Sequence, residues 1–299
     1  MEKNAGILSP LKDLSVPVII LMGNHDDNSY YYMCDWVENN SSATDDEKNA
    51  VFNDTVVTKS EWKAAFNNTY GANVDLVYNN DDVNSNYYYF DIANKKTRVI
   101  CLDSIDYGIA TTKYNGFTLY GYGIKQIKWL AEKALTADSD WKYIFLSHME
   151  SEKRVFNSSL TKIKADECSL NMLIYACQNN GEFNYTDGTV TVSRNFADSP
   201  TGKICSYQFG HVHADLQLYN EELNLAYLLT GTSGQFTYGA AEHTVAEGNI
   251  KNAIAPLRKK GKISEALFDI TTVSDSAVNV IRFGAIAEGY QKNTTYTIK

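Results

Sequence analysis

The segment Val16-Pro-Val-Ile-Ile-Leu-Met22, followed at once by Gly23-Asn-His-Asp26, tells most about the architecture of this chain. Seven apolar residues in a row, several of them β-branched, predict a buried strand. The polar residues after it would then stand at the carboxyl end of that strand. This is where α/β proteins bind their ligands, in a crevice beyond the strand ends.

Two further predicted strands also lead into histidines. Tyr143–Leu146 runs into Ser147-His148, and Ile204–Phe209 runs into Gly210-His-Val-His213. Four of the five histidines therefore follow strands, and only His243 lies elsewhere. We predict that these side chains meet at one edge of a sheet, because the carboxyl ends of parallel strands share an edge.

The rest of the chain alternates between helical and strand-like patterns, which predicts an α/β fold with mixed sheets. Helical spacing covers Gly123–Leu135 and Ser169–Gln178. Further strands are predicted at Tyr87–Ile92, Thr97–Leu102, Leu225–Thr230, Ala266–Val273 and Ala277–Phe283. No repeat or low-complexity linker divides the sequence, so we expect a single domain over residues 1–299.

Composition excludes several classes of protein. The 299 residues are 44% hydrophobic and 21% charged, the balance of a globular chain and not of a disordered one. The net charge of −9 disfavours binding to nucleic-acid backbones. No apolar run approaches the ~20 residues of a membrane span. Five cysteines in a chain of this size do not indicate a disulfide framework, and Cys101 and Cys205 are expected to act as small core residues.

The candidate ligand set consists of one amide and three imidazoles, from Asn24, His148, His211 and His213. These donors suit a borderline transition metal better than Ca²⁺ or Mg²⁺. In an extended backbone His211 and His213 would point to the same side of the chain. The glycine before each motif would let the backbone approach a ligand closely.

His25 lies beside this set without needing to bind the metal. A histidine held by a carboxylate, here Asp26, is a suitable general acid near neutral pH. Asp103 and Ser104 also follow a strand, but we expect them to cap a turn. The basic run at residues 258–262 is expected to form a solvated loop.

Taken in order, Gly23-Asn24-His25-Asp26, His148 and Gly210-His211-Val212-His213 resemble the motif set of the calcineurin-like metallophosphoesterases. Further segments are similar to a bacterial subgroup of that family, many members of which are exported. These segments are Arg98–Ser104, Gln126–Leu130, Phe209–Asp215, Gly231–Gly234, Glu265–Asp269 and Ile281–Gly284.

The resemblance implies two mixed β-sheets packed face to face, with helices outside. It implies hydrolysis of a small phosphomonoester or phosphodiester with two divalent transition-metal ions, Mn, Fe or Zn. Asn24, His148 and His211 would bind one ion and His213 the other. His25 would protonate the leaving alkoxide or stabilise the phosphoryl oxygens, and Asp26 would orient His25. An extracellular or cell-surface location would follow from the exported relatives.

The sequence departs from the family at its start. Members begin with strands ending in Asp-x-His and Gly-Asp, but the residues before Gly23 contain no histidine and a single aspartate, Asp13. A strand–helix–strand unit takes about 30 residues, so we expect an N-terminally truncated domain. This chain would bind one ion weakly or none, and it would be weakly active or inactive alone. A non-catalytic remnant or binding module on the same scaffold and an enzyme of the purple acid phosphatase type are the alternatives. Substrate, metal, compartment and oligomeric state stay open.

Overall fold

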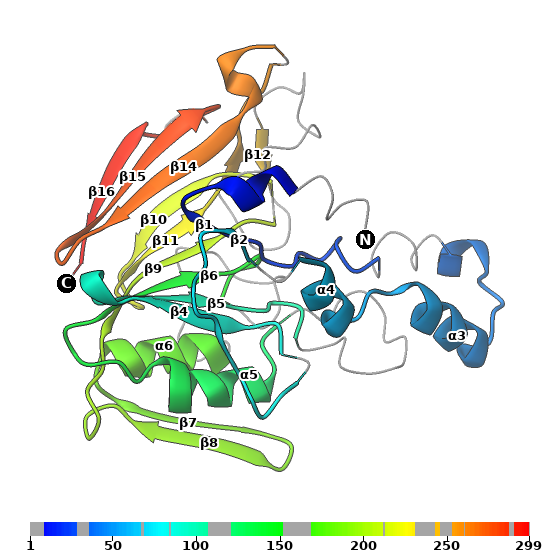
Figure 1. Ribbon diagram of the computed structural model, residues 1–299, viewed down its shortest axis with the longest axis horizontal. Helices are drawn as coiled ribbons and strands as arrows, with labels where there is room; N and C mark the ends of the chain where they lie inside the picture. The colour runs from blue at the N-terminus through cyan, green and yellow to red at the C-terminus, as the bar shows by residue number, and fades with distance from the viewer. Residues whose placement is uncertain are drawn as a thin grey trace.

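A seven-stranded mixed sheet forms the centre of the molecule (Figure 1). The computed structural model describes residues 9–28, 36–66, 69–83, 85–106, 121–151, 169–211, 213–230, 243–245, 253–259, 261–286 and 290–298. The strands lie in the order β10-β11-β9-β6-β5-β4-β3, and β11, β9, β6 and β5 run parallel to one another. Their bounds are β3 Val77–Tyr78, β4 Tyr88–Ile92, β5 Thr97–Cys101, β6 Lys142–Leu146, β9 Lys203–Phe209, β10 Leu216–Asn220 and β11 Leu225–Leu229.

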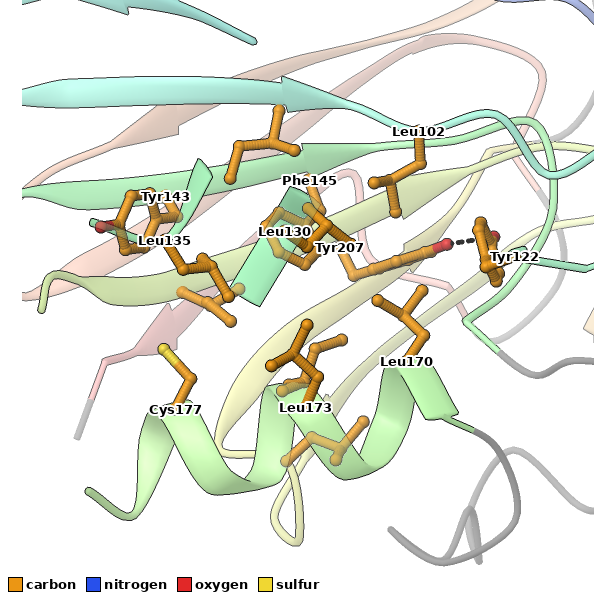
Figure 2. Close-up of a cluster of buried hydrophobic side chains, with 14 of the residues drawn as sticks. Leu102, Tyr122, Leu130, Leu135, Tyr143, Phe145, Leu170, Leu173, Cys177 and Tyr207 are labelled. Carbon is orange, nitrogen blue, oxygen red and sulfur yellow. Dashed lines mark hydrogen bonds between the residues drawn. The ribbon is translucent and has the colours of Figure 1, made fainter. Parts of the chain in front are cut away.

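Helices cover one face of this sheet. They are α5 (Ile124–Trp129), which continues as one π-helical turn over Leu130–Ala134, and α6 (Ser169–Gln178). Figure 2 shows Leu170, Leu173 and Cys177 of α6 pointing toward the sheet residues Phe145 and Tyr207. Outside the helices lies a hairpin of β7 (Glu182–Asp187) and β8 (Val190–Asn195).

A second sheet covers part of the opposite face. It contains β14 (Leu267–Val273), β15 (Ala277–Gly284) and β16 (Asn293–Thr297), all antiparallel. Its buried residues Val278, Val280 and Tyr296 pack against Cys205 and Leu228 of the central sheet. The α/β class and the two packed sheets with outer helices are therefore as predicted. Within the described residues no helix is long and apolar enough to span a membrane.

The N-terminal apolar run differs from its prediction. Only Pro17–Ile19 forms a strand, β1, and it pairs with β2 (Thr69–Gly71) instead of joining the central sheet. Val16 is 57% exposed, so the segment is not a buried central strand. Its side chains alternate: Val18 and Ile20 pack in one cluster, and Ile19 and Leu21 pack against the central sheet in another. The run is apolar without interruption because the side chains on both of its sides pack against apolar residues.

The remaining elements surround this framework. α3 (Asp45–Thr55) begins with a capping box between Thr44 and Glu47. In α4 (Lys59–Phe66) the rings of Trp62 and Phe66 pack at a tilt, with their centroids 4.3 Å apart. Short 3₁₀ turns occupy Ser9–Asp13, Ala93–Lys95 and Ile263–Glu265, and β12 (His243–Val245) pairs with β13 (Ala253–Ala255).

Arg258 corrects the prediction of a solvated basic loop. Its side chain is 1% exposed, and its guanidinium donates to the carbonyl of Glu265. Lys259 and Lys262 are exposed, as expected. An arginine has a long apolar stem and five N–H donors, so it can be buried where a backbone carbonyl accepts a hydrogen bond from it. Cys101 and Cys205 are buried free thiols inside strands, which confirms their prediction as core residues.

The β7–β8 hairpin escaped the sequence analysis, although Gly188-Thr189, with glycine in the first position, is a typical two-residue hairpin turn. Gly188 has φ +60°, and a Cβ built there would meet nothing within 4 Å. We therefore expect Gly188→Ala to lower the free energy of unfolding by about 1 kcal/mol through backbone strain alone. Gly181→Ala is the matched control, because Gly181 does not share this φ and a Cβ there makes ordinary contacts at 3.8 Å. Equal urea midpoints for the two variants would contradict the expectation.

Candidate metal centre

Strand register brings two of the predicted histidines to the same edge. β6 and β9 are parallel neighbours, with Leu146 opposite Gln208. His148 follows β6 and His211 follows β9, and the Gly210 N–H donates to the His148 carbonyl at 3.1 Å. The two imidazole rings lie 5.1 Å apart between centroids, in an edge-to-face arrangement. The parallel sheet therefore brings these two histidines together from positions 63 residues apart in the chain.

Asn24 completes a contact of three side chains. Its Oδ1 lies 2.8 Å from His148 Nε2 and 3.2 Å from His211 Nδ1. The two ring nitrogens are themselves 3.2 Å apart. Asn24 is 3% exposed, and both histidines are half-buried. Three donor atoms from three distant segments thus converge on one small region.

Hydrogen bonding alone does not account for this triangle. Asn24 Oδ1 can accept from both rings, but the two ring nitrogens then face each other as donors. If one ring nitrogen instead presents its lone pair, that lone pair faces the Asn24 oxygen. Whichever tautomers the two rings adopt, at least one of the three contacts joins two hydrogen-bond donors or two acceptors. A cation in contact with all three lone pairs would remove this conflict. Adjacent ligand atoms around one ion at ~2.0–2.2 Å lie about 3 Å apart, so the donor set fits a transition-metal ion.

The electrostatic environment keeps these imidazoles neutral. Burial, followed by the charges of His211, His25 and His213, lowers the pKa of His148 to about 3. Burial, followed by His213 and His25, lowers the pKa of His211 to about 4. A metal ligand must be the neutral imidazole, so both side chains are available for that role at neutral pH.

Three buried tyrosines fix the loop that carries His148. The Tyr122 hydroxyl donates to the Glu150 carbonyl at 2.6 Å and accepts from the Tyr207 hydroxyl at 2.6 Å, the pair shown by a dashed line in Figure 2. The Tyr207 hydroxyl also lies 3.0 Å from the Met149 carbonyl, and the Ser151 N–H donates to the Tyr227 hydroxyl at 3.0 Å. Sequence analysis did not identify these positioning residues. Tyr207 and Tyr227 lie in predicted strands, whereas Tyr122 directly precedes the predicted helix Gly123–Leu135.

The backbone at His211 and His213 is not extended. Their φ angles are +78° and +57°, in the left-handed region that non-glycine residues seldom adopt. The chain must reverse here, because β10 runs antiparallel to β11, which is itself parallel to β9. The expectation that an extended backbone points both rings to one side therefore does not apply. Strained backbone of this kind clusters at functional sites.

Gly23 and Asp26 shape the turn that presents Asn24. A Cβ on Gly23 would lie 3.0 Å from Cε1 of His148, so a larger residue would push this ring away. The Asp26 carboxylate accepts a hydrogen bond from the Gly23 N–H at 2.7 Å and closes the turn. Burial raises the pKa of Asp26, while the Gly23 N–H and the charge of His25 oppose that rise.

His25 and His213 lie within electrostatic range of the triangle, since both lower the pKa of His148 and of His211. His25 is exposed, and His213 is half-buried. The structure therefore gathers Asn24, His148 and His211 in direct contact and places the other two histidines nearby. The metal and catalytic roles assigned from the sequence remain predictions.

A separate charged cluster lies beyond the end of β5. Asp103 forms a buried ion pair with Lys59 of α4 and accepts the Ile105 N–H at 3.0 Å. Lys59 also lies 3.3 Å from Asp106, whose pKa is raised by burial. Asp103 thus caps a turn, as predicted, and ties α4 to the sheet.

Comparisons with known proteins give little further information. No protein-family model matches the sequence, and no curated protein matches it. Among solved structures it is similar to a dimetal phosphatase from Danio rerio, with 12% identity and a TM-score of 0.38. The likeness covers 73% of this chain and 62% of that one, so this chain spans less than two thirds of its length. A likeness this weak establishes neither a shared site nor a shared function.

Over the described residues, no group of three or more His, Cys, Asp and Glu side chains is placed to hold a metal. The triangle falls outside this description because its third ligand atom, beside the two imidazole nitrogens, is the amide oxygen of Asn24.

Proposed function

We propose that this protein is a metal-dependent phosphoric ester hydrolase. The contact among Asn24 Oδ1, His148 Nε2 and His211 Nδ1 carries the proposal, because its three neutral donors suit one transition-metal ion. His213 is the proposed ligand of a second ion. Such ions, when bound, polarise phosphoryl oxygens and lower the pKa of water at the site.

The chain's own residues would bind the ester and move a proton. His25 is exposed beside the triangle, where it can approach a bound substrate and donate a proton to the departing oxygen. Asp26 holds the turn through Gly23 and acts electrostatically on His25, so its proposed role is to fix that imidazole. The motif resemblance supports a phosphomonoester or phosphodiester as substrate.

The proposed metal-ligand atoms in the described residues are all neutral. No negative charge among them would offset the charge of a bound dication. We therefore expect weak metal retention and slow turnover from these ligands. The experiment is calorimetric titration with Mn²⁺ and Zn²⁺, beside assays on p-nitrophenyl phosphate and bis(p-nitrophenyl) phosphate. Hydrolysis that appears with Mn²⁺ and disappears on chelation is the expected result. A protein that binds neither ion would contradict the proposal.

The same experiment tests a second candidate function, a binding module that keeps the scaffold without the chemistry. One observation favours it: the described residues bring no carboxylate into the triangle of donors. Metal binding without turnover of either ester, at any Mn²⁺ concentration, would support the module and count against the hydrolase.

A further inference from the structure

One buried arginine connects the second sheet to the loops at the candidate metal centre. Arg282 of β15 is 2% exposed and lies between two aspartates. Its Nε and Nη2 donate to the Asp269 carboxylate at 2.6 and 2.9 Å, and its Nη1 donates to Asp215 Oδ2 at 2.7 Å. Such a two-pronged pair fixes orientation as well as distance. We call these three residues the Arg282 clamp.

The clamp reaches chain segments at the site edge. Asp215 is fully buried and lies two residues after His213, at the end of the turn that carries both left-handed histidines. The Tyr290 hydroxyl donates to the Asp215 carbonyl at 2.6 Å, so a second bond from the C-terminal region holds the same residue. The turn from Gly210 to Asp215 is therefore anchored by the second sheet.

Asp269, the other carboxylate of the clamp, contacts the residue that follows β11. Asp269 Oδ2 accepts from the Thr230 hydroxyl at 2.9 Å, and Thr230 comes directly after β11. The Thr230 N–H in turn donates to the carbonyl of Phe209, the last residue of β9, at 3.0 Å. One guanidinium thus joins the chain segments beyond the ends of β9 and β11, two adjacent strands of the central sheet.

A turn with two non-glycine residues at positive φ needs support from outside itself, because its backbone geometry is unfavourable. The clamp supplies that support at a point two residues from His213. We propose that Arg282 is a positioning residue of the candidate metal centre, which holds the His211–His213 turn in place through Asp215. The part of this inference that concerns metal rests on the proposed function, whereas the part that concerns the turn does not.

The chain offers a matched control for a role in stability alone. Arg98 of β5 makes the same kind of pair, with Nε and Nη2 donating to Asp91 at 2.7 and 2.9 Å and Nη1 donating to the Ala134 carbonyl at 2.8 Å. It is 7% exposed and lies near the start of β5, whereas the candidate centre lies beyond the opposite ends of the parallel strands. Arg98→Lys and Arg282→Lys therefore each remove a two-pronged pair, the first near the start of β5 and the second in β15 of the second sheet.

The experiment measures two properties of the full chain. Hydrogen exchange of the peptide covering residues 209–216 reports on the turn, and titration with Zn²⁺ reports on the centre. We expect Arg282→Lys to speed exchange in that peptide and to weaken Zn²⁺ binding about 10- to 100-fold, the usual effect of losing a residue that orients a ligand. Arg98→Lys should change neither. Asp215→Asn, with Asp91→Asn as its control, provides the same comparison if Arg282→Lys does not fold.

The outcomes separate the clamp from the proposed function. Unchanged exchange at residues 209–216 in Arg282→Lys and Asp215→Asn would overturn the clamp, as would equal effects of the two arginine variants on Zn²⁺ binding. If the parent chain binds no Zn²⁺, the proposed function fails at its first step. The exchange result then still decides whether Arg282 holds the turn.

Discussion

His148→Ala is expected to lower the affinity for Zn²⁺ or Mn²⁺ by more than about 100-fold. Loss of a residue that only orients a ligand typically costs 10- to 100-fold, and His148 is itself a proposed ligand. Its Nε2 lies 2.8 Å from Asn24 Oδ1 and 3.2 Å from His211 Nδ1, so alanine leaves two of three donors. Isothermal titration calorimetry of parent and variant measures the change directly.

His243→Ala is the control for this variant, because His243 lies in β12 and does not follow any of the three strands that lead to the centre. It should bind metal as the parent does. The free energy of unfolding without metal is measured for both variants, so that a loss of folded protein is not mistaken for a loss of ligand. Parent-like affinity in His148→Ala would remove the triangle as a metal site.

This part of the site could be predicted because the strands themselves follow strong local signals. Tyr143–Leu146 and Ile204–Phe209 are short apolar runs that lead into histidines, and parallel pairing of the two strands carries both histidines to one edge. Asn24 was predicted to join them on the assumption that Val16–Met22 is a strand of the same sheet, which is wrong. It lies with them nonetheless, and Ile19 and Leu21 of this segment pack against the central sheet.

The rest depended on pairings that no local pattern encodes. Arg282 meets Asp215 across 67 positions, and Tyr122 meets Tyr207 across 85. The alternation along a strand indicates which face a tyrosine or arginine occupies, but it does not indicate which distant residue that side chain meets. The left-handed φ of His211 and His213 could not be predicted either, because it depends on where the chain must go after β9.

His25→Asn is expected to separate catalysis from metal binding. His25 is exposed and lies outside the three-atom contact, yet its charge influences both His148 and His211. A side chain so placed can reach a bound ester without holding the ion. If His25 donates the proton that the departing oxygen needs, asparagine should reduce turnover by about 10²- to 10⁴-fold. Metal affinity should stay within a few-fold of the parent.

The leaving group gives the sharper test of that role. Breaking the P–O bond of an alkyl ester leaves an alkoxide that must gain a proton, whereas p-nitrophenolate is stable without one. The loss in His25→Asn should therefore be large for an alkyl phosphodiester and much smaller for bis(p-nitrophenyl) phosphate. Asp26→Asn should show the same trend to a lesser degree, because it removes the charge beside His25 but keeps the imidazole. An equal loss for both esters would show that His25 acts by binding the phosphoryl group and not by donating a proton.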